Sequence, residues 1–293
     1  LVEEGVLQLA NGRYYWMSEA YPAEEVSLRT ASTDNFVIIE QGPKPRVIGE
    51  CDRPSAPLLI HEDAIYLHRG QQYQVEHLDW DDKKAYVRAV SVDYYTDAQL
   101  AVDLKVLERE REAPAGGDSA WELGEAAITF LATIFKKVKL HTHENVGWGQ
   151  IAIPEETMHT AAAWLTLGEG AAAGLRRDEL ALGLEGLAHV LRNLAPVFCL
   201  CDPRDLGADA QVRSPSTGAP TVYLYDMVPG GIGLAERVFE ARERLLRAAR
   251  DAVAGCGCER GCPSCVGPQA ERGSPAKRAA LLLLERLAGA SGS

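Results

Sequence analysis

Four cysteines within ten residues form the part of the sequence best suited to chemistry. Their spacing is C-x-C-x3-C-x2-C, and they are Cys256, Cys258, Cys262 and Cys265. Four thiolates on so short a loop can converge on one cation, and Zn²⁺ accepts a tetrahedral shell of four sulfurs. Because a closed shell leaves no position for water, the spacing predicts a structural zinc site and argues against hydrolysis at the metal.

Two disulfides or four free thiols are the alternatives to zinc, and both are weaker. Disulfide frameworks are typical of small secreted chains, whereas this chain has 293 residues and an odd number of cysteines, seven. Gly257 and Gly261 would let the backbone curl around an ion, and Arg260 could offset the negative charge of the thiolates. Outside the cluster, we expect free, buried thiols at Cys51, Cys199 and Cys201.

The composition is that of a globular protein with an acidic balance. With 46% hydrophobic residues the chain can bury a sizeable core, and no apolar run is long enough for a transmembrane helix. The first residue is Leu1 and no signal peptide is recognisable, so we expect a piece of a longer cytoplasmic protein with no membrane partner. The formal net charge of −12 opposes non-specific binding to polyanions, so a nucleic-acid role requires a local basic patch.

A second group of chemically capable residues lies around residue 140. His141, His143 and Glu144 could hold a second metal or act as general acid and base, as in a stand-alone hydrolase, but a polar cluster before a Gly-x-Gly turn is more typical of a recognition loop. Lysines precede this stretch and an indole follows it, which suits contact with a nucleotide chain as well as it suits a solvated strand edge. The predicted contacts are Lys136, Lys137, Lys139, His141, His143, Asn145 and Trp148.

The segment from residue 226 to residue 254 offers two further places for an anion. Arginines face outward on its predicted helix, and we select Arg242 and Arg247 as nucleic-acid contacts, with a solvated helix face as the alternative. The Gly-rich run 230–233 could cradle an anion at a helix start, but a tight turn explains it as well, and we expect Asp226 to cap or pair locally. The sequence has no phosphate loop and no magnesium box, so this chain alone should not hydrolyse ATP, and whether it is an enzyme stays open.

The hydrophobic patterns predict an α+β protein. They indicate a curled antiparallel sheet or small β-barrel in the N-terminal half and a helical zinc-binding subdomain in the C-terminal half. The predicted domains are 1–34, 35–170 and 171–293. The first contains a hairpin over 5–17, which could be the wing of a winged helix, and a linker. Strands are predicted at 36–40, 45–49, 65–68, 71–80, 85–95, 100–111, 121–140 and 221–225. The segments 100–111 and 121–140 could also be helices, but their alternating apolar residues favour strands. A helical turn is predicted at 54–63, a turn at 202–207, and helices at 177–200, from the run 229–233 to about 254, and at 274–287.

Several stretches together resemble a known family. The cysteines stand in the setting CGCERGCPSCVGP, preceded by DPRDLG and YLYDMVPGGIGLAE, and the upstream signatures are IHEDAIYLHRGQQYQVEHLDWDDKKAYVRAVSVDYYT and THENVGWG. This combination resembles the C-terminal zinc-binding domain of the MrfA-like superfamily 2 DNA helicases, a bacterial mitomycin-repair group with fungal relatives. The resemblance covers nearly the whole chain.

The resemblance implies a piece of an ATP-dependent 3′-to-5′ DNA helicase that translocates on single strands and acts in DNA repair. It implies that Cys256, Cys258, Cys262 and Cys265 are zinc ligands and that residues 1–34 end a winged-helix domain. The implied partners are single-stranded DNA and RecA-like motor domains. ATP and Mg²⁺ would act only through those motors, which this sequence lacks. A structural or protein-interaction module without DNA contact is the alternative, and the acidic balance favours it.

Overall fold

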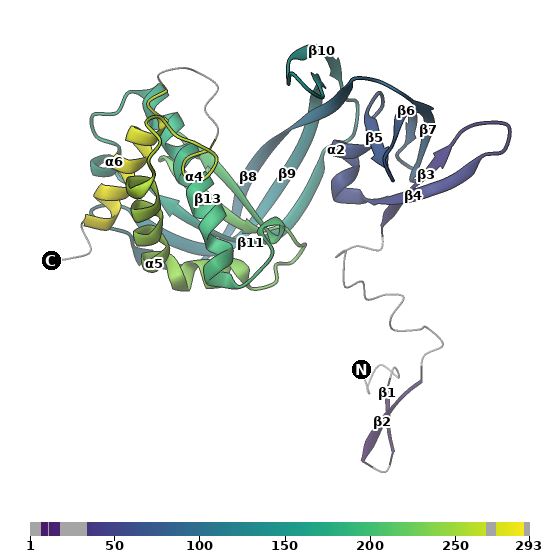
Figure 1. Ribbon diagram of the computed structural model, residues 1–293. Helices are drawn as coiled ribbons and strands as arrows, with labels where there is room; N and C mark the ends of the chain where they lie inside the picture. The colour runs from purple at the N-terminus through teal and green to yellow at the C-terminus, as the bar shows by residue number, and fades with distance from the viewer. Residues whose placement is uncertain (1–6, 11, 18–33, 268–273, 290–293) are drawn as a thin grey trace. The chain divides into compact units, whose positions relative to one another are not determined.

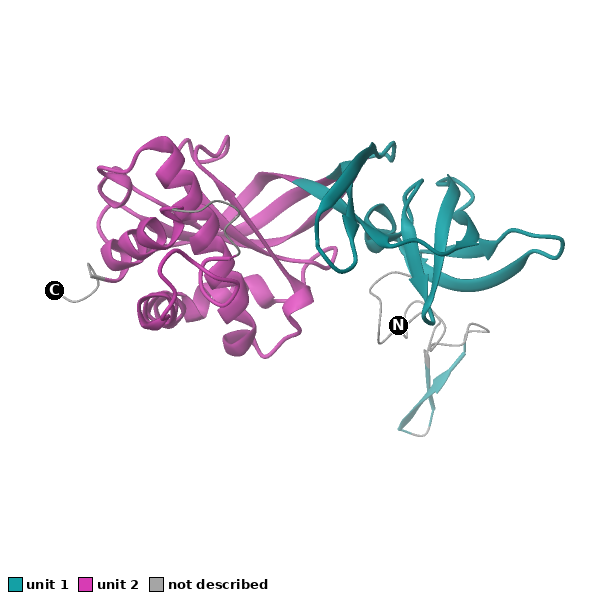
Figure 2. Cartoon of the chain, turned by 45° about the horizontal axis from the view of Figure 1, so that its top comes forward, with its two compact units in different colours: residues 1–101, 131–154 teal, residues 102–130, 155–293 magenta. Residues whose placement is uncertain are grey.

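The protein has an α+β fold, as the sequence predicts. The computed structural model describes residues 7–10, 12–17, 34–267 and 274–289. The chain forms two compact units, and each combines two separate segments (Figure 2). Unit 1 comprises residues 1–101 and 131–154, and unit 2 comprises residues 102–130 and 155–293. The domain boundaries expected near residues 34 and 170 concern which segments fold independently, and they stay a prediction.

Unit 1 is built on a five-stranded sheet with the order β4-β3-β7-β6-β5 (Figure 1). A short helical turn, η1 (Arg53–Ser55) and α2 (Ala56–Leu59), lies within the predicted range 54–63 except for Arg53. Apolar side chains on alternate strand positions form the core. The strands are β3 (Asn35–Glu40), β4 (Arg46–Asp52), β5 (Ile65–His68), β6 (Gln71–Asp79) and β7 (Lys84–Val90).

Two features of this sheet differ from the predicted antiparallel meander. The β3 and β7 strands pair in parallel, although β5, β6 and β7 form the expected antiparallel meander. The predicted strand 85–95 is also two strands, because the β7 ladder ends where Val90 faces Gln72. Beyond that point the Val92 N–H donates to the Gln72 side-chain oxygen at 3.0 Å, so a side chain replaces the backbone partner. The next strand begins at Tyr94.

A two-stranded hairpin, β1 (Leu7–Ala10) and β2 (Arg13–Trp16), confirms part of the predicted hairpin. Gly12 has a φ of 73°, the left-handed conformation that a tight two-residue turn requires. The predicted linker falls on residues 18–33, which lie outside the described residues.

The long strands β8 (Tyr94–Pro114) and β9 (Ala120–Lys139) confirm the predicted strands at 100–111 and 121–140, and each contributes to both units. The first part of β9 pairs with β11 (Glu156–Thr166) in unit 2. Its last part pairs with β10 (Asn145–Gln150) in unit 1.

Unit 2 continues its sheet from β11 to β13 (Thr221–Asp226) and then to β12 (Leu206–Gln211), always antiparallel. Every residue of β13 is buried, as befits a strand covered on both faces. The predicted turn at 202–207 is correct only for its first part, η2 (Pro203–Asp205), because the β12 ladder begins at Leu206, opposite Asp226. Leu206, Ala208 and Ala210 do alternate along the run LGADAQ and pack in or against the large core, but the run has none of the β-branched or aromatic residues that are typical of strands.

Three helices and the sheet of unit 2 share one large core (Figure 1). They are α4 (Arg177–Cys199), α5 (Leu234–Gly255) and α6 (Ala276–Gly289), close to the predicted ranges, and a short helix α3 (Glu169–Ala172) precedes them. A second core, which includes Leu104, Trp164 and Tyr223, contains the remaining buried side chains of these strands. No helix among the described residues is long and apolar enough to cross a membrane.

Unit 1 contains a buried histidine, His61, whose environment disfavours the protonated ring. His61 is 0% exposed, its ring lies 4.6 Å from that of Phe135, and its Nε2 has no hydrogen-bond partner among the described residues. Its Nδ1 lies 2.8 Å from the carbonyl oxygen of Glu62. Burial lowers the pKa of His61 below its ordinary value of 6.5, because the charged ring would lose its hydration.

We predict that the chain loses stability as the pH falls from 7.5 to 5. The unfolded chain binds a proton at His61 more readily than the folded chain, so stability is present above pH 6.5 and is lost as the pH falls through the lowered pKa. Urea unfolding at both pH values measures this loss, which should be smaller in His61→Leu. His141→Gln, which changes an exposed histidine of the same unit, should keep the wild-type pH dependence. An unaltered pH dependence in His61→Leu would contradict the assignment.

Candidate metal centre and nucleic-acid interface

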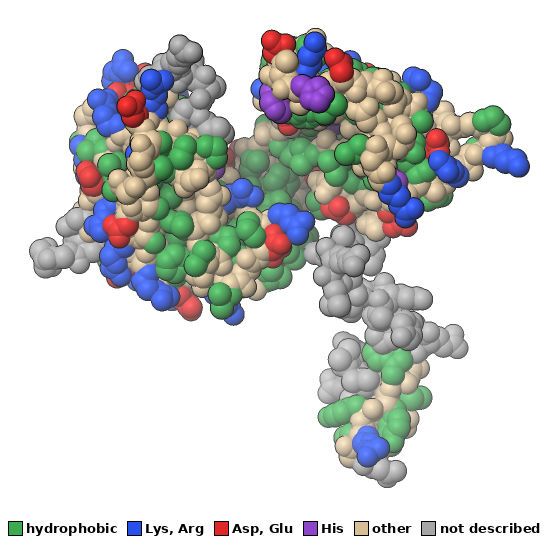
Figure 3. All heavy atoms as spheres, in the orientation of Figure 1, with side chains coloured by type: hydrophobic (Ala, Val, Ile, Leu, Met, Phe, Trp, Pro, Cys, Tyr) green, Lys and Arg blue, Asp and Glu red, His purple; other side chains and the backbone are tan. Residues whose placement is uncertain are grey.

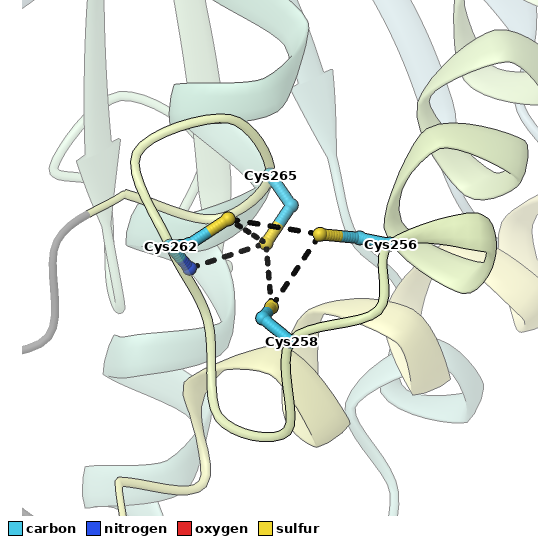
Figure 4. A group of neighbouring side chains, drawn as sticks. All are labelled: Cys256, Cys258, Cys262 and Cys265. Atoms are coloured by element: carbon cyan, nitrogen blue, oxygen red, sulfur yellow. Dashed lines mark hydrogen bonds between the residues drawn. The ribbon is translucent and has the colours of Figure 1, made fainter.

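The four predicted cysteines come together at one point in unit 2. The loop that carries them begins at the end of α5, and their side chains converge (Figure 4). All four sulfurs lie within 4.8 Å of one another. Four of the sulfur–sulfur separations are 3.5, 3.6, 3.5 and 3.7 Å, for the pairs 256–258, 256–262, 258–265 and 262–265.

These separations fit a tetrahedral zinc ion. Four sulfurs about 2.3 Å from one ion, at the corners of a tetrahedron, are about 3.8 Å apart. A disulfide would require a separation of about 2.05 Å, and all seven cysteines are free. The donor set, four thiols without carboxylate or imidazole, is also the set that zinc takes in closed structural sites. The residues present therefore fit the predicted ion.

The second half of the loop is a tight turn with the N–H of Cys262 directed at the cluster. The Cys262 N–H donates to the Cys265 sulfur at 3.3 Å, and the Cys262 carbonyl accepts from the N–H groups of Cys265 and Gly267 at 3.0 and 3.1 Å. Gly267 has a φ of 87°, which a residue with a side chain rarely adopts. Burial raises the pKa of the Cys265 thiol to about 12, so this thiol is protonated without a metal and would release its proton on binding one.

Lys277, in the first turn of α6, is the cation that holds the loop. Its ammonium donates to the carbonyl oxygens of Cys256 at 2.6 Å and Cys258 at 2.5 Å. Four thiolates around one Zn²⁺ leave a net negative charge, and an ammonium beside two of the ligand residues offsets it. Arg260, predicted for this role, is exposed, and its carbonyl accepts from the Lys277 N–H at 3.3 Å.

The α4 helix supports the loop from another side. The Nε2 of His189 lies 2.7 Å from the carbonyl oxygen of Pro263, between two of the cysteines. A Cβ on Gly186 would come within 2.9 Å of Val266, so a glycine is needed where the helix meets the loop. Neither residue was selected from the sequence, because contacts over 70 residues or more leave no local pattern.

The opposite end of α5 is fixed by a buried carboxylate. Asp226 is 0% exposed, and its side chain accepts from the N–H groups of Ile232, Leu234 and Ala235 at 2.6, 3.2 and 2.8 Å. These are the free donors of a helix start, which attract negative charge. The prediction that Asp226 caps locally is confirmed, and the protein's own carboxylate occupies the place that the glycine run 230–233 would otherwise offer to an anion.

The predicted nucleic-acid contacts around residue 140 lie together on the β9–β10 hairpin of unit 1. Trp148 of β10 stands opposite Lys136 of β9, and the Lys136 ammonium lies 5.0 Å from the centre of the indole ring. The Lys137 ammonium lies 5.6 Å from the Tyr94 ring, and that of Lys139 is 4.0 Å from Asp93. Trp148 is 57% exposed, so much of its surface remains accessible.

The turn of this hairpin carries the remaining polar candidates. His141, His143 and Asn145 are exposed, and His143 has a φ of 56°. The Asn145 side chain accepts from the Gly147 N–H at 3.0 Å, and the Thr142 hydroxyl donates to Glu144 at 3.1 Å. In the described part of the chain, the four cysteines are the one group of metal-ligating side chains gathered closely enough to share an ion. The geometry therefore lends no support to a second metal at the histidines.

The two arginines selected from the sequence lie in unit 2. Arg242 stacks on Phe239, with 4.9 Å between the guanidinium carbon and the ring centre, and donates to the Phe239 carbonyl at 2.9 Å. Arg247 lies 3.8 Å from Glu243. On the face shown in Figure 3, Lys and Arg side chains are interspersed with Asp and Glu.

Comparison with known families agrees with the metal centre. Residues 187–266 match the family model described as the MrfA Zn-binding domain, a range that includes all four cysteines. By this match, residues 187–266 form a zinc-binding domain of the MrfA type.

Individual proteins and a solved structure are also similar to this chain. The chain is 47% identical over 289 residues to the "Uncharacterized ATP-dependent helicase YprA" of Bacillus subtilis, covering 98% of this chain and 38% of that protein. It is 22% identical over 268 residues to the ATP-dependent helicase HRQ1 of Saccharomyces cerevisiae, and the match covers 84% of this chain and 24% of that protein. A crystal structure of the DUF1998 helicase MrfA bound to DNA superposes on this chain with a TM-score of 0.70 and 46% sequence identity. The match covers 98% of this chain and 38% of that one. The chain thus spans well under half the length of these relatives.

We predict that the purified chain contains one zinc ion and that replacing the four clustered cysteines by serine removes it. Elemental analysis measures the metal. The melting temperature should fall by roughly 10 °C or more, because each kcal/mol lost lowers it by about 2–4 °C in a protein of this size. Cys201→Ser, outside the cluster, should keep both the metal and the melting temperature. Metal-free wild-type protein would overturn the zinc assignment.

We also predict that Lys277→Met weakens zinc binding by about 10- to 100-fold, the usual effect of removing a group that supports metal ligands. Competition with a chromogenic chelator measures the affinity, and Lys277→Arg should restore most of it. Arg278→Met is the matched control, because Arg278 is the next residue of α6, is exposed and bonds Glu179 at 2.7 Å. If Lys277→Met retains zinc as well as Arg278→Met does, Lys277 does not stabilise the centre.

Proposed function

We propose that this chain is the zinc-binding accessory part of an ATP-dependent 3′-to-5′ DNA helicase that acts in DNA repair. The observation that carries the proposal is the 47% identity to an ATP-dependent helicase over 98% of the chain. The relatives' additional length would supply RecA-like motor domains, with ATP and Mg²⁺ bound there. In this proposal Cys256, Cys258, Cys262 and Cys265 hold a structural zinc ion.

Within that role, the β9–β10 hairpin is the proposed contact for single-stranded DNA. An exposed indole beside an ammonium offers a base a stacking surface and offers its phosphate a counter-charge. Such contacts tolerate any base sequence, which suits a helicase that moves along a strand. The similar helicase MrfA has been crystallised bound to DNA, which supports a DNA-binding parent protein.

A structural or protein-interaction module without DNA contact is the second candidate. The net charge of −12 favours it, because a polyanion is repelled by an acidic protein. The contact of Lys139 with Asp93 also reduces the positive charge that the hairpin can offer.

The two candidates differ in the effect of hairpin variants on DNA binding. For the strand-contact proposal, Trp148→Ala should weaken binding of a labelled single strand to the chain by about 5- to 150-fold, because one stacked base contributes about 1–3 kcal/mol. Lys136→Gln should reduce the slope of log affinity against log salt by about 0.7, the value for one lost phosphate contact. Fluorescence anisotropy measures both.

Lys84→Gln is the matched control for the charge, because Lys84 lies on β7 of the same unit and pairs with Asp82 at 3.0 Å. It should leave affinity and salt slope unchanged. DNA affinity that is equal in wild type, Trp148→Ala and Lys136→Gln would reject the strand contact and favour the structural module.

A further inference from the structure

Unit 2 contains a cavity of about 350 Å³ that the zinc centre and the hairpin contact do not use. It is lined by the turn between β8 and β9, one side of α5 and the last turn of α6. The residues that decide its chemistry are Gly116, Gly117, Trp121, Arg242, Arg247 and Leu287. A volume of this size is within the range of small-molecule sites.

Arg242 brings a half-buried cation with unused hydrogen-bonding capacity to this cavity. Its Nε is buried and has no hydrogen-bond partner among the described residues, although another nitrogen donates to the Phe239 carbonyl. None of the ion pairs found in the described part of the chain includes Arg242 or Arg111, whose guanidinium lies 4.7 Å from the same Phe239 ring. Two cations without carboxylates thus share one aromatic ring.

Trp121 provides a second donor without an acceptor. The side chain is 0% exposed, and its Nε1 finds no partner in the described structure. By contrast, the N–H of Trp164 donates to Glu122 at 2.7 Å. A buried donor without an acceptor is unfavourable, and two of them lie on residues that line this one cavity, so its wall has donors that no acceptor among the described residues uses.

The other walls limit what the ligand can be. Glu243 also lines the cavity, but its carboxylate lies 3.8 Å from Arg247, so one acidic side chain faces two guanidiniums. The last turn of α6 adds partial negative charge, which directs an anion toward α5. Gly116 and Gly117 have φ values of 94° and 58° and carry no side chain into the space, while Leu246 and Leu287 form an apolar wall.

We propose that this cavity binds a phosphate ester, with the phosphate held by Arg242 and Arg247. Planar guanidinium groups match the oxygens of a phosphate, and the apolar wall suits the organic part of an ester better than a bare ion. The ester is either a free nucleotide or a phosphate of a DNA strand. The assignment is independent of the hairpin contact, which lies in unit 1.

Isothermal titration of the chain with adenosine monophosphate, inorganic phosphate and a single-stranded oligothymidylate tests the proposal. Arg242→Gln and Arg247→Gln should each weaken binding of the monophosphate by about tenfold or more, since each loses a charge-assisted hydrogen bond. Trp121→Phe, which keeps a ring but loses the N–H, should weaken it less. Arg250→Gln is the matched control, because Arg250 lies on the same helix, bonds Asp251 at 2.8 Å and does not line the cavity.

The outcomes separate the two sources of phosphate. Tight binding of the monophosphate indicates a free nucleotide, whereas binding of the oligonucleotide alone, weakened by the same two substitutions, indicates a DNA strand. In the wild type, the bound probe should also slow modification of Arg242 and Arg247 by phenylglyoxal relative to Arg250, which does not depend on the variants folding. No binding of any probe at millimolar concentration, or binding that Arg242→Gln leaves unchanged, overturns the proposal. Trp148→Ala in the same titration shows separately whether the hairpin contact has failed.

Discussion

The convergence of four cysteine sulfurs is the constraint on which the helical layer of unit 2 depends. The described part of the loop between α5 and α6 places Cys265 and Val266 in the large core, but no helix or strand fixes its backbone over residues 256–267. Its shape instead follows from sulfurs 3.5 to 3.7 Å apart, a spacing that thiolates tolerate only around a cation. The first turn of α6 then meets this loop through Lys277, whose two bonds to cysteine carbonyls tie the start of one helix to the end of another.

The α5 helix is consequently held at its start by hydrogen bonds to a carboxylate, at its end by the cysteine loop, and between them by packing against the core. At its start, the buried carboxylate of Asp226 accepts from three backbone N–H groups, and at its end the chain enters the cysteine loop. Between them, one side of the helix is buried against the sheet. Close helix approach adds to this, because a Cβ on Gly183 would come within 3.0 Å of Ala279 on α6. Small residues on α4 therefore allow α6 and the cysteine loop to lie close to it. The positions of the four cysteines depend on this close packing.

Local patterns predicted the elements, and long-range contacts explain the misses. Alternation of Ile128, Phe130 and Ala132 identified β9, and helical spacing identified α4 and α5, because each pattern comes from one element facing one core. The parallel pairing of β3 with β7 was missed because a pairing partner some 45 residues away leaves no local pattern. The strand β12 was missed because its alternating positions hold mostly Ala, a weak strand former, rather than β-branched or aromatic residues. The cysteine spacing was informative because ligands so close in sequence must also be close in space. Lys277 and His189 reach the loop from other helices, so local spacing could not predict their contacts with it.

The acidic balance of the chain is compatible with phosphate recognition because several cations at the proposed sites lie against aromatic rings and form no ion pair among the described residues. Lys136 lies over Trp148, Lys137 over Tyr94, and both Arg111 and Arg242 over Phe239. A ring attracts a cation without neutralising it, so the charge remains available to a phosphate. Where arginines form close ion pairs, as Arg204 does with Asp202 at 3.0 Å and Arg250 with Asp251 at 2.8 Å, that availability is reduced more than in the longer pair of Arg247 with Glu243 at 3.8 Å. Local partners, more than the net charge, therefore decide which cations of this chain can meet a nucleic acid or a nucleotide.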